Sequence, residues 1–330
     1  MREPSFWWRP PGVEAALLAP IAAAYGEIAA QRLRQPGRKI EVAVVCVGNL
    51  TVGGVGKTPA ALAVARLLIA AGQRPFFLSR GYGGRLAGPL RIDPVLHRAI
   101  DVGDEPLLLA RVAPTIVARD RVAGAEMART MGAGIIVMDD GFQNPSLVKD
   151  LAILVLDGRG IGNGRVIPAG PLRAPLQAQL DRAHAVLMVG ASSAASAPAL
   201  AAAGARGLPI FHGRLEPNAN AIAALAGRRV LAFAGIGDPG KFFATLAEAG
   251  IEAVIRQGFP DHHRYSRAEA EALLARAASE GLLPVTTEKD MARMIGDADV
   301  AALAKAAQAL AVTLAIDEED ALRKLLATVT

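Results

Sequence analysis

A glycine-rich segment near residue 50 carries the clearest chemistry in the sequence. The run Gly48–Pro59 reads GNLTVGGVGKTP and lies between an apolar run and a helical pattern. Glycines let backbone N–H groups curl around a polyphosphate, and the following helix adds the positive end of its dipole. Lys57 can place a cation on the β and γ oxygens, and the Thr58 hydroxyl is suited to hold Mg²⁺. We therefore predict a nucleoside triphosphate site formed by Thr51, Val52, Gly53, Gly54, Val55, Gly56, Lys57 and Thr58.

Carboxylates that could hold the metal follow an apolar run further along the chain. Asp139 and Asp140 end the segment Ile135–Asp140, which has the composition of a buried strand. Transfer of a phosphoryl group needs such an acid beside the phosphate loop, for the metal or its water. Asp157, which ends another apolar run, is a weaker candidate of the same type. The alternative interpretation is a pair of solvated aspartates in a turn.

Other candidate acids and bases lie at expected turns. Asp104 and Glu105 precede a helical pattern, where a plain helix cap would also place acidic residues. His262 and His263 are adjacent, so on an extended chain their side chains point in opposite directions and cannot readily share one ligand. The sequence therefore does not favour a zinc site, and a loop histidine that is exposed and inert remains an alternative to a catalytic one.

Basic and polar residues recur near the expected strand ends. Each arginine alone is a solvated surface charge by default, but ligands of parallel sheets bind at these ends, so the group predicts an anionic second substrate. The candidates for its binding are Arg80, Tyr82, Arg119, Asn163, Arg165 and Arg173. Nucleic acid is not the expected partner, because the basic residues lack interleaved aromatic residues and a recognised binding module.

The elements that must position these residues alternate regularly. Short aliphatic runs without polar alternation are typical of parallel strands that helices cover on both faces. We expect strands at 42–47, 75–78, 115–118, 135–138, 151–156 and 185–189, with helices at 59–71, 106–112 and 121–130 between them. This order predicts a doubly wound, mainly parallel α/β sheet. A second alternation predicts a smaller α/β lobe at 229–330, after a phosphate-loop domain at 40–190 and a connecting region at 191–228.

The first 39 residues form a segment of their own. Leu17, Leu18, Ile21, Tyr25 and Ile28 recur at helical spacing, and Phe6, Trp7, Trp8 and several arginines flank them. Indole rings and arginines at the ends of an apolar helix are typical of an anchor at a membrane interface. The uncharged stretch between Glu14 and Glu27 is shorter than the ~20 residues that a spanning helix needs. A helix that simply packs on the domain is the alternative.

Composition limits the class of protein. The chain has 330 residues, of which 52% are hydrophobic, 20% charged and 4% aromatic, so it is neither disordered nor fibrous and its core must be aliphatic. Its only cysteine, Cys46, cannot form a disulfide within the chain, which favours a reducing compartment. The net charge of +5 suits an acidic ligand, a membrane surface or nucleic acid without choosing among them.

Several motifs, taken together and in order, resemble one family. They are TVGGVGKTP at 51–59, SRGY at 79–82, VGDEP at 102–106, DDGFQ at 139–143, NGRVIPAGPLR at 163–173, AFAGIG at 232–237, Asp261-His262 and TEKD at 287–290. The chain resembles the tetraacyldisaccharide 4′-kinases, the lipid A 4′-kinases of Gram-negative bacteria. The resemblance also accounts for Thr51, since the family carries Thr or Ser there. Asn144 departs from it, because many members have His at that position.

The resemblance implies an ATP-dependent transfer of phosphate to the 4′-hydroxyl of a tetraacylated glucosamine disaccharide 1-phosphate, giving lipid IVA. By position, Lys57 and Thr58 would bind phosphate and Mg²⁺, while Glu105, Asp139 and Asp140 would surround the metal. Asp104 would accept the proton of the sugar hydroxyl, with His262 supporting it. A lipid substrate implies attachment to the cytoplasmic face of the inner membrane through the N-terminal helix, with no obligate protein partner.

Two other interpretations remain at this point. A phosphate-loop switch would hydrolyse a nucleotide to control a partner, but Thr287–Asp290 has Glu where a guanine-binding motif has Lys. A kinase for a soluble small molecule is the second alternative.

Overall fold

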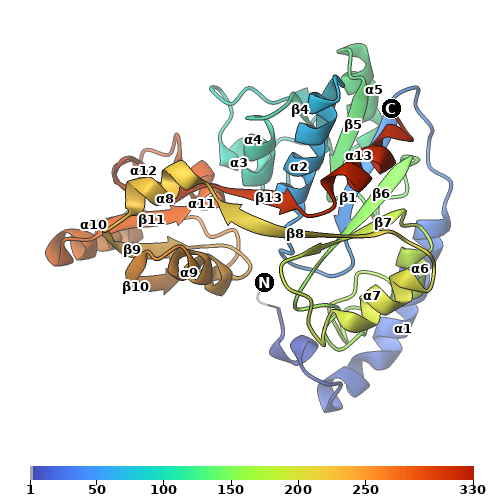
Figure 1. Ribbon diagram of the computed structural model, residues 1–330, viewed down its shortest axis with the longest axis horizontal. Helices are drawn as coiled ribbons and strands as arrows, with labels where there is room; N and C mark the ends of the chain where they lie inside the picture. The colour runs from blue at the N-terminus through green and yellow to red at the C-terminus, as the bar shows by residue number, and fades with distance from the viewer. Residues whose placement is uncertain (1–2) are drawn as a thin grey trace.

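The computed structural model describes residues 3–330 and divides them into two lobes, each built on its own sheet (Figure 1). Within these residues the large sheet has nine strands in the order β13-β8-β7-β6-β1-β5-β2-β4-β3, and the small sheet has four in the order β10-β9-β11-β12. The large sheet contains β1 (Ala43–Asn49), β2 (Pro75–Ser79), β3 (Leu90–Arg91), β4 (Thr115–Val117), β5 (Ile135–Asp139), β6 (Leu151–Asp157), β7 (Ala185–Val189), β8 (Ile210–Pro217) and β13 (Val312–Ile316). The small sheet contains β9 (Arg229–Ala234), β10 (Glu252–Gly258), β11 (Leu283–Thr287) and β12 (Gln308–Leu310).

Helices cover both faces of the large sheet. On one face α2 (Lys57–Ala70) and α13 (Glu319–Ala327) share an apolar core with β1, β5 and β6. The opposite core joins the sheet to α1 (Val13–Arg34), α5 (Arg121–Thr130), α6 (Leu176–Leu180) and α7 (Ala197–Gly204). Burial on both faces explains why the strands read as continuous aliphatic runs, and it confirms the predicted doubly wound α/β fold.

The small lobe is also covered on both faces. Helices α8 (Ala219–Leu225) and α9 (Pro239–Glu248) pack on one face, and α10 (Arg267–Glu280), α11 (Glu288–Met294) and α12 (Ala301–Ala306) contribute to the core on the other. Short helices α3 (Ala99–Val102) and α4 (Asp104–Leu109) of the large lobe face this lobe, with α11 against α4. The junction between the lobes therefore lies at the N-terminal end of α4.

The C-terminal residues belong to the large lobe, whereas the predicted division at residue 229 placed them in the small lobe. Strand β13 pairs with β8 in antiparallel register, Leu314 opposite Leu215, and so adds to the large sheet. Leu322 and Leu326 of α13 then join the core beneath α2. The segment expected to be a connection, 191–228, itself contains α7, β8 and α8. Figure 1 shows β8 and β13 running together between the two lobes, so residues 312–330 complete the first lobe.

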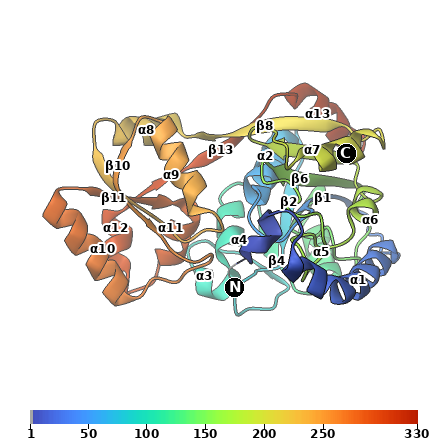
Figure 2. The same ribbon diagram turned by 90° about the horizontal axis from the view of Figure 1, so that it is seen from below.

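Helix α1 lies along the edge of the large lobe, away from the small lobe (Figure 2). It has 22 residues because it continues through both Glu14 and Glu27. It is therefore longer than the uncharged stretch suggested, and within residues 3–330 it is the one helix long and apolar enough to cross a membrane by length and composition. Four of its small residues, Ala15, Ala22, Gly26 and Ala30, are buried against the domain. By contrast, Leu17, Ile21 and Ile28 are exposed.

One of the two indole rings before α1, that of Trp7, is not placed as expected from the sequence. Trp7, in the short 3₁₀ helix Ser5–Trp8, is buried and its Nε1 donates to the carbonyl of Pro168 at 2.9 Å. Its own carbonyl accepts from the N–H of Asn163 at 2.8 Å. Trp7 thus attaches the N-terminal segment to the domain and is not available to an interface.

Candidate active site

The phosphate loop connects β1 to α2. Gly53 and Gly56 have φ of 101° and 91°, left-handed values that favour glycine, and Gly56 is the residue that precedes the first turn of α2. The loop is held from outside, because the N–H of Val52 donates to the carbonyl of Pro171 at 2.8 Å. Gly54 is exposed, while Thr51, Val55 and Thr58 are buried. The predicted loop therefore has the curled backbone that a polyphosphate requires.

Lys57 lies inside this loop. Its Nζ donates to the carbonyl of Gly53 at 3.3 Å and lies 3.8 Å from the Asp140 carboxylate. Burial lowers the pKa of Lys57, against the opposing effect of Asp140. Within residues 3–330, Asp140 is the one carboxylate within 4.0 Å of this ammonium group, which leaves it able to pair with phosphate oxygens.

Asp139 and Asp140 lie beside the loop because β5 pairs with β1, Val47 opposite Asp139. Asp139 is buried, and among residues 3–330 neither of its carboxylate oxygens has a hydrogen-bond partner. Burial, then Glu105 and Asp140, raises its pKa to about 7. The Thr58 hydroxyl and the Asn49 Oδ1 are further buried oxygens near the loop that lack a partner within those residues. Unpaired buried oxygens of this kind need an explanation, and a hard cation supplies one.

In contrast to Asp139, both carboxylate oxygens of Asp140 accept hydrogen bonds. It has a positive φ of 51°, and Arg173 donates from Nη1 and Nη2 to its two oxygens at 2.8 and 3.2 Å. Burial alone would raise the pKa of Asp140, but Lys57 and Arg173 lower it below its usual value. Arg173 Nε also donates to the carbonyl of Thr51 at 3.0 Å. Arg173 therefore connects the acid to the phosphate loop, a place different from the expected contact with a second substrate.

A second acidic pair comes from the first turn of α4. Asp104 is buried, and its Oδ2 lies 3.4 Å from Nδ1 of His262, which comes from the small lobe. This pairing raises the pKa of His262, whereas His263 turns away and contacts Glu269. Burial alone would raise the pKa of Asp104, but the His262 hydrogen bond and the charge of Arg293 lower it below its usual value. The structure thus brings together Asp104 and His262, from opposite lobes.

Glu105 lies next to this pair and close to the phosphate loop. Its charge opposes the lowering of the Lys57 pKa and adds to the raising of the Asp139 pKa. The three groups are therefore electrostatically coupled. Glu105 itself is paired with Lys289 at 2.5 Å. Although burial opposes the change, Lys289 lowers the pKa of Glu105. The two predicted acidic clusters are therefore parts of one site.

The remaining predicted residues are placed more loosely. Tyr82 is exposed, and its ring lies 5.1 Å from the His262 ring, so it stands at the rim of the site. Arg80, Arg119 and Arg165 are exposed. The Asn163 side chain is used within its own loop, where it donates to the carbonyl of Ala169 at 2.8 Å and accepts from the N–H of Arg165.

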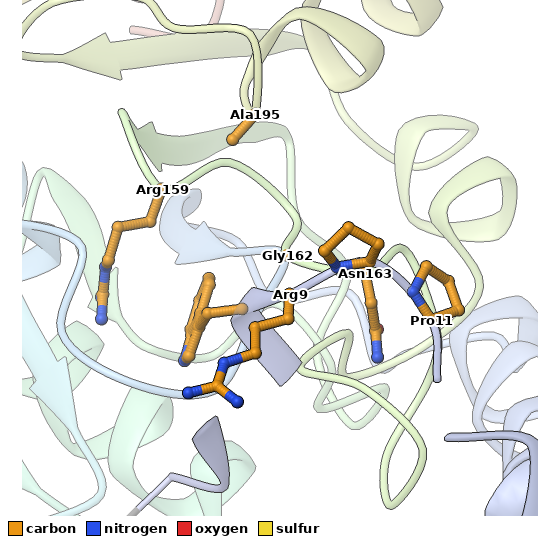
Figure 3. A pocket seen from close by; sticks show the side chains of 8 residues that line it. Arg9, Pro11, Arg159, Gly162, Asn163 and Ala195 are labelled. Atoms are coloured by element: carbon orange, nitrogen blue, oxygen red, sulfur yellow. The ribbon is translucent and has the colours of Figure 1, made fainter. Parts of the chain in front are cut away.

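The N-terminal segment reaches the phosphate loop. The Glu3 carboxylate lies against Gly53, where a Cβ would come within 2.0 Å of it, and it pairs with Arg159 at 3.5 Å. Arg159 also donates to the carbonyl of Gly54 at 3.1 Å and stacks over the Trp8 ring. A pocket of about 450 Å³ opens between this segment and the loop after β6, with Arg9, Arg159 and Asn163 around it (Figure 3).

Sequence reasoning assigned no role to two cations at the centre of this site. Lys289 and Arg293, both on α11, contact Glu105 and Asp104. Lys289 lies in the TEKD motif, and Arg293 lies four residues after Lys289. This spacing puts both on one helical face, a signal that could have marked them as a pair. Only the tertiary structure shows that the face meets two carboxylates.

These elements define a class of protein. A phosphate loop between a buried parallel strand and a helix, with an acid at the tip of the neighbouring strand, is the site of a P-loop NTPase-like α/β protein. The family model for tetraacyldisaccharide-1-P 4′-kinase (LpxK) matches residues 14–330. The chain belongs to this family.

Individual relatives match over nearly their whole length. The chain is 57% identical over 329 residues to the tetraacyldisaccharide 4′-kinase of Methylobacterium sp. (strain 4-46), covering 99% of this chain and 97% of the relative. It is 54% identical over 324 residues to that of Rhodopseudomonas palustris (strain BisB18), covering 98% and 94%. The crystal structure of LpxK from Aquifex aeolicus in complex with ATP superposes with a TM-score of 0.73 at 28% identity, covering 96% of this chain and 99% of that one.

Proposed function

We propose that this chain transfers the γ-phosphate of ATP to the 4′-hydroxyl of a tetraacyl glucosamine disaccharide 1-phosphate, forming lipid IVA. Membership of the tetraacyldisaccharide 4′-kinase family over residues 14–330 supports the reaction. The observation that carries the mechanism is the meeting of Lys57, Asp139 and Glu105 with the Asp104–His262 pair at the lobe junction. Phosphoryl transfer depends mainly on positioning and charge neutralisation, which this arrangement supplies.

ATP binds at the phosphate loop in this proposal. The backbone of 51–56 surrounds the phosphates, and the Lys57 ammonium pairs with the β and γ oxygens. The LpxK of Aquifex aeolicus was crystallised in complex with ATP, which supports the same nucleotide here. Glu3 and Arg159 lie against the loop from outside and support its conformation.

Mg²⁺ fits the unpaired oxygens beside the loop. Thr58 and Asp139 would hold it, with Asp140 and Glu105 nearby as further carboxylates, because hard oxygen donors are the ligands that this ion prefers. When bound, it neutralises negative charge on the phosphates. Without a cation, the Asp139 carboxylate keeps the raised pKa described above.

Asp104 accepts the proton of the acceptor hydroxyl. Its Oδ2 faces the His262 imidazole, and its Oδ1 accepts only the N–H of Glu105 within residues 3–330, so Oδ1 keeps a lone pair for a substrate hydroxyl. His262 stabilises the carboxylate and orients it. Tyr82, whose ring lies tilted beside that of His262, is positioned to contact the sugar.

The lipid reaches the site from a membrane surface. Leu17, Ile21 and Ile28 form an exposed apolar face on α1, while Ala22, Gly26 and Ala30 of the same helix are buried against the domain. Such a face is suited to enter the acyl region of a bilayer, where a substrate with four acyl chains resides. The pocket beside Arg9 and Arg159 (Figure 3) could receive an anionic part of the headgroup, and the exposed Arg80, Arg119 and Arg165 add positive charge.

The test is transfer of labelled γ-phosphate from ATP to a tetraacyl disaccharide 1-phosphate in detergent micelles. Wild type should form a phosphorylated lipid, and Lys57→Ala and Asp104→Ala should each lose about 10²-fold or more in kcat. Absence of lipid product, with nucleotide hydrolysis that responds to a protein partner, would overturn the proposal.

A further inference from the structure

The face of α11 that meets α4 carries two cations, Lys289 and Arg293, beside the acids of the active site. Lys289 and Arg293 are four residues apart, so they lie one turn apart on the same side of the helix. Each pairs with a different carboxylate of the neighbouring residues Asp104 and Glu105. The small lobe thus contacts both acids of the large lobe through one helix.

The contact with Asp104 has a fixed geometry. Arg293 donates from Nε to Oδ2 at 2.7 Å, and its Nη2 lies 2.6 Å from the same oxygen as an ion pair without a hydrogen bond. Both side chains are almost fully buried, 6% and 4% exposed, so water does not compete for these bonds. The carboxylate accepts on Oδ1 from the N–H of Glu105 at 3.0 Å. Donors on both oxygens prevent rotation of the carboxylate about its bond to Cβ.

Arg293 is itself held from behind. Its Nη1 donates to the carbonyl of Gly235 at 2.6 Å and to Asp290 at 2.8 Å. Asp290 is fully buried and also accepts from the Tyr265 hydroxyl at 2.9 Å and the Thr287 hydroxyl at 2.6 Å. The last residue of the TEKD motif, Asp290, therefore holds the Arg293 side chain in place. The first residue, Thr287, supports it by donating to the Asp290 carboxylate.

We propose that Arg293 and Lys289 are positioning residues of the phosphoryl transfer, which orient Asp104 toward the acceptor hydroxyl and Glu105 toward the phosphate loop. The inference rests on the proposed role of Asp104 as the proton acceptor. A cation that contacts a base stabilises its charged form and does not increase its basicity, so the gain comes from orientation. Because α11 and His262 belong to the same lobe, Asp104 is oriented only when the two lobes are together.

A purely structural role predicts a different pattern. Arg111 and Glu288 form another ion pair between the lobes at the same junction, with 3.4 Å between Nη1 and Oε1, and this pair contacts neither Asp104 nor Glu105. If the α11 cations only hold the lobes together, loss of the Arg111 pair should resemble loss of Arg293. Arg111→Ala is therefore the control for loss of an ion pair between the lobes, one whose side chains are 44% and 28% exposed.

The experiment compares kcat and KM for the lipid and for ATP in full-length Arg293→Ala, Lys289→Ala and Arg111→Ala. We expect Arg293→Ala to lower kcat about 10²-fold while KM for ATP changes less than about threefold, and we expect added guanidinium to recover about tenfold of the loss. Lys289→Ala should lower kcat about tenfold, with recovery by methylammonium. Arg111→Ala should keep the wild-type kcat.

A double variant separates this inference from the function on which it rests. In the Asp104→Ala background, Arg293→Ala should cause less than about a twofold further loss, because orientation matters only if the carboxylate is present. If Asp104→Ala alone retains full kcat, the proposed base is wrong whatever Arg293 does. If Asp104→Ala is inactive but the Arg293 loss equals that of Arg111→Ala, or guanidinium recovers nothing, the positioning role is wrong. Should Arg293→Ala fail to fold, Arg293→Lys, which keeps the charge but has one donor nitrogen in place of three, must show an intermediate kcat.

Discussion

Asp139 is a single residue whose surroundings indicate that a ligand binds beside it. Its carboxylate is buried at the end of β5 and has no hydrogen-bond partner within residues 3–330. Burial, Glu105 and Asp140 raise its pKa to about 7, and the charges of Lys57 and Lys289 offset only part of this. A natural protein keeps a buried acid in this condition only where a bound cation or a proton compensates it.

Stability in the absence of divalent cations should therefore depend on pH through Asp139. Its folded-state pKa of about 7 lies above the reference value of 3.8, so the folded protein holds the extra proton between these values. Its contribution to the free energy of unfolding should fall by about 1.4 kcal/mol from pH 6 to pH 8. Urea unfolding in EDTA, wild type against Asp139→Asn, measures this difference. A difference that stays constant between the two pH values would contradict the prediction.

At the scale of one element, α1 has two faces with different roles. Ala15, Ala22, Gly26 and Ala30 are buried, which lets the helix backbone approach the domain closely. A Cβ on Gly26 would lie 3.5 Å from Pro175, in ordinary contact. The larger apolar residues Leu17, Ile21 and Ile28 are 58–75% exposed. The small side packs on the protein, and the large side is left for another apolar phase.

Replacing Leu17, Ile21 and Ile28 by Ser should weaken binding to anionic phospholipid vesicles by about 10²-fold or more, since each exposed side chain buries apolar surface in the bilayer. The thermal midpoint should change little, because these side chains contact solvent in the folded protein. Vesicle co-sedimentation measures the effect. The control is the same change at Val95 and Leu96, which are 91% and 75% exposed but lie outside α1. An equal loss of binding in that variant would remove the special role of α1.

At the scale of the whole molecule, the chain crosses between the lobes twice. It leaves the large lobe through β8 and returns through β13, and these strands pair with each other. Asp104 and His262, which act together in the proposed mechanism, belong to opposite lobes. Lys241 of α9 also reaches Asp157 at the end of β6, 2.5 Å away. The site is thus assembled at a junction and not within one lobe.

The C-terminal helix should stabilise the nucleotide-binding lobe although it follows the small lobe in sequence. Leu322→Ala removes a fully buried side chain from the core that contains α2, so we expect it to destabilise that lobe by about 2–5 kcal/mol. Hydrogen exchange should show reduced protection in β1 and β5 and unchanged protection in β9. Leu303→Ala, equally buried in the small lobe, is the control with the opposite pattern. Loss of protection in β9 for Leu322→Ala would show that α13 belongs with the small lobe.

The sequence by itself determined the local chemistry and the type of each element. The GKT motif after an aliphatic run predicts the phosphate loop, and uninterrupted aliphatic strands predict a sheet covered on both faces; the family and the fold confirm both. These features depend on residues close together in the chain, where hydrophobic period and turn chemistry are direct signals.

Only the tertiary structure decided which distant residues meet. The strand and helix at 312–330 could have extended either sheet, and the pairing of β13 with β8 selects the large one. Arg173, expected at the second substrate, reaches Asp140 instead, and Trp7 is buried against the domain. The spacing of Arg293 from Lys289 could mark the two as a pair, but it could not reveal the partner Asp104, which lies 189 residues away and on the other lobe. Contacts of such separation arise from how two folded lobes pack, and the physical rules of local sequence do not encode that packing.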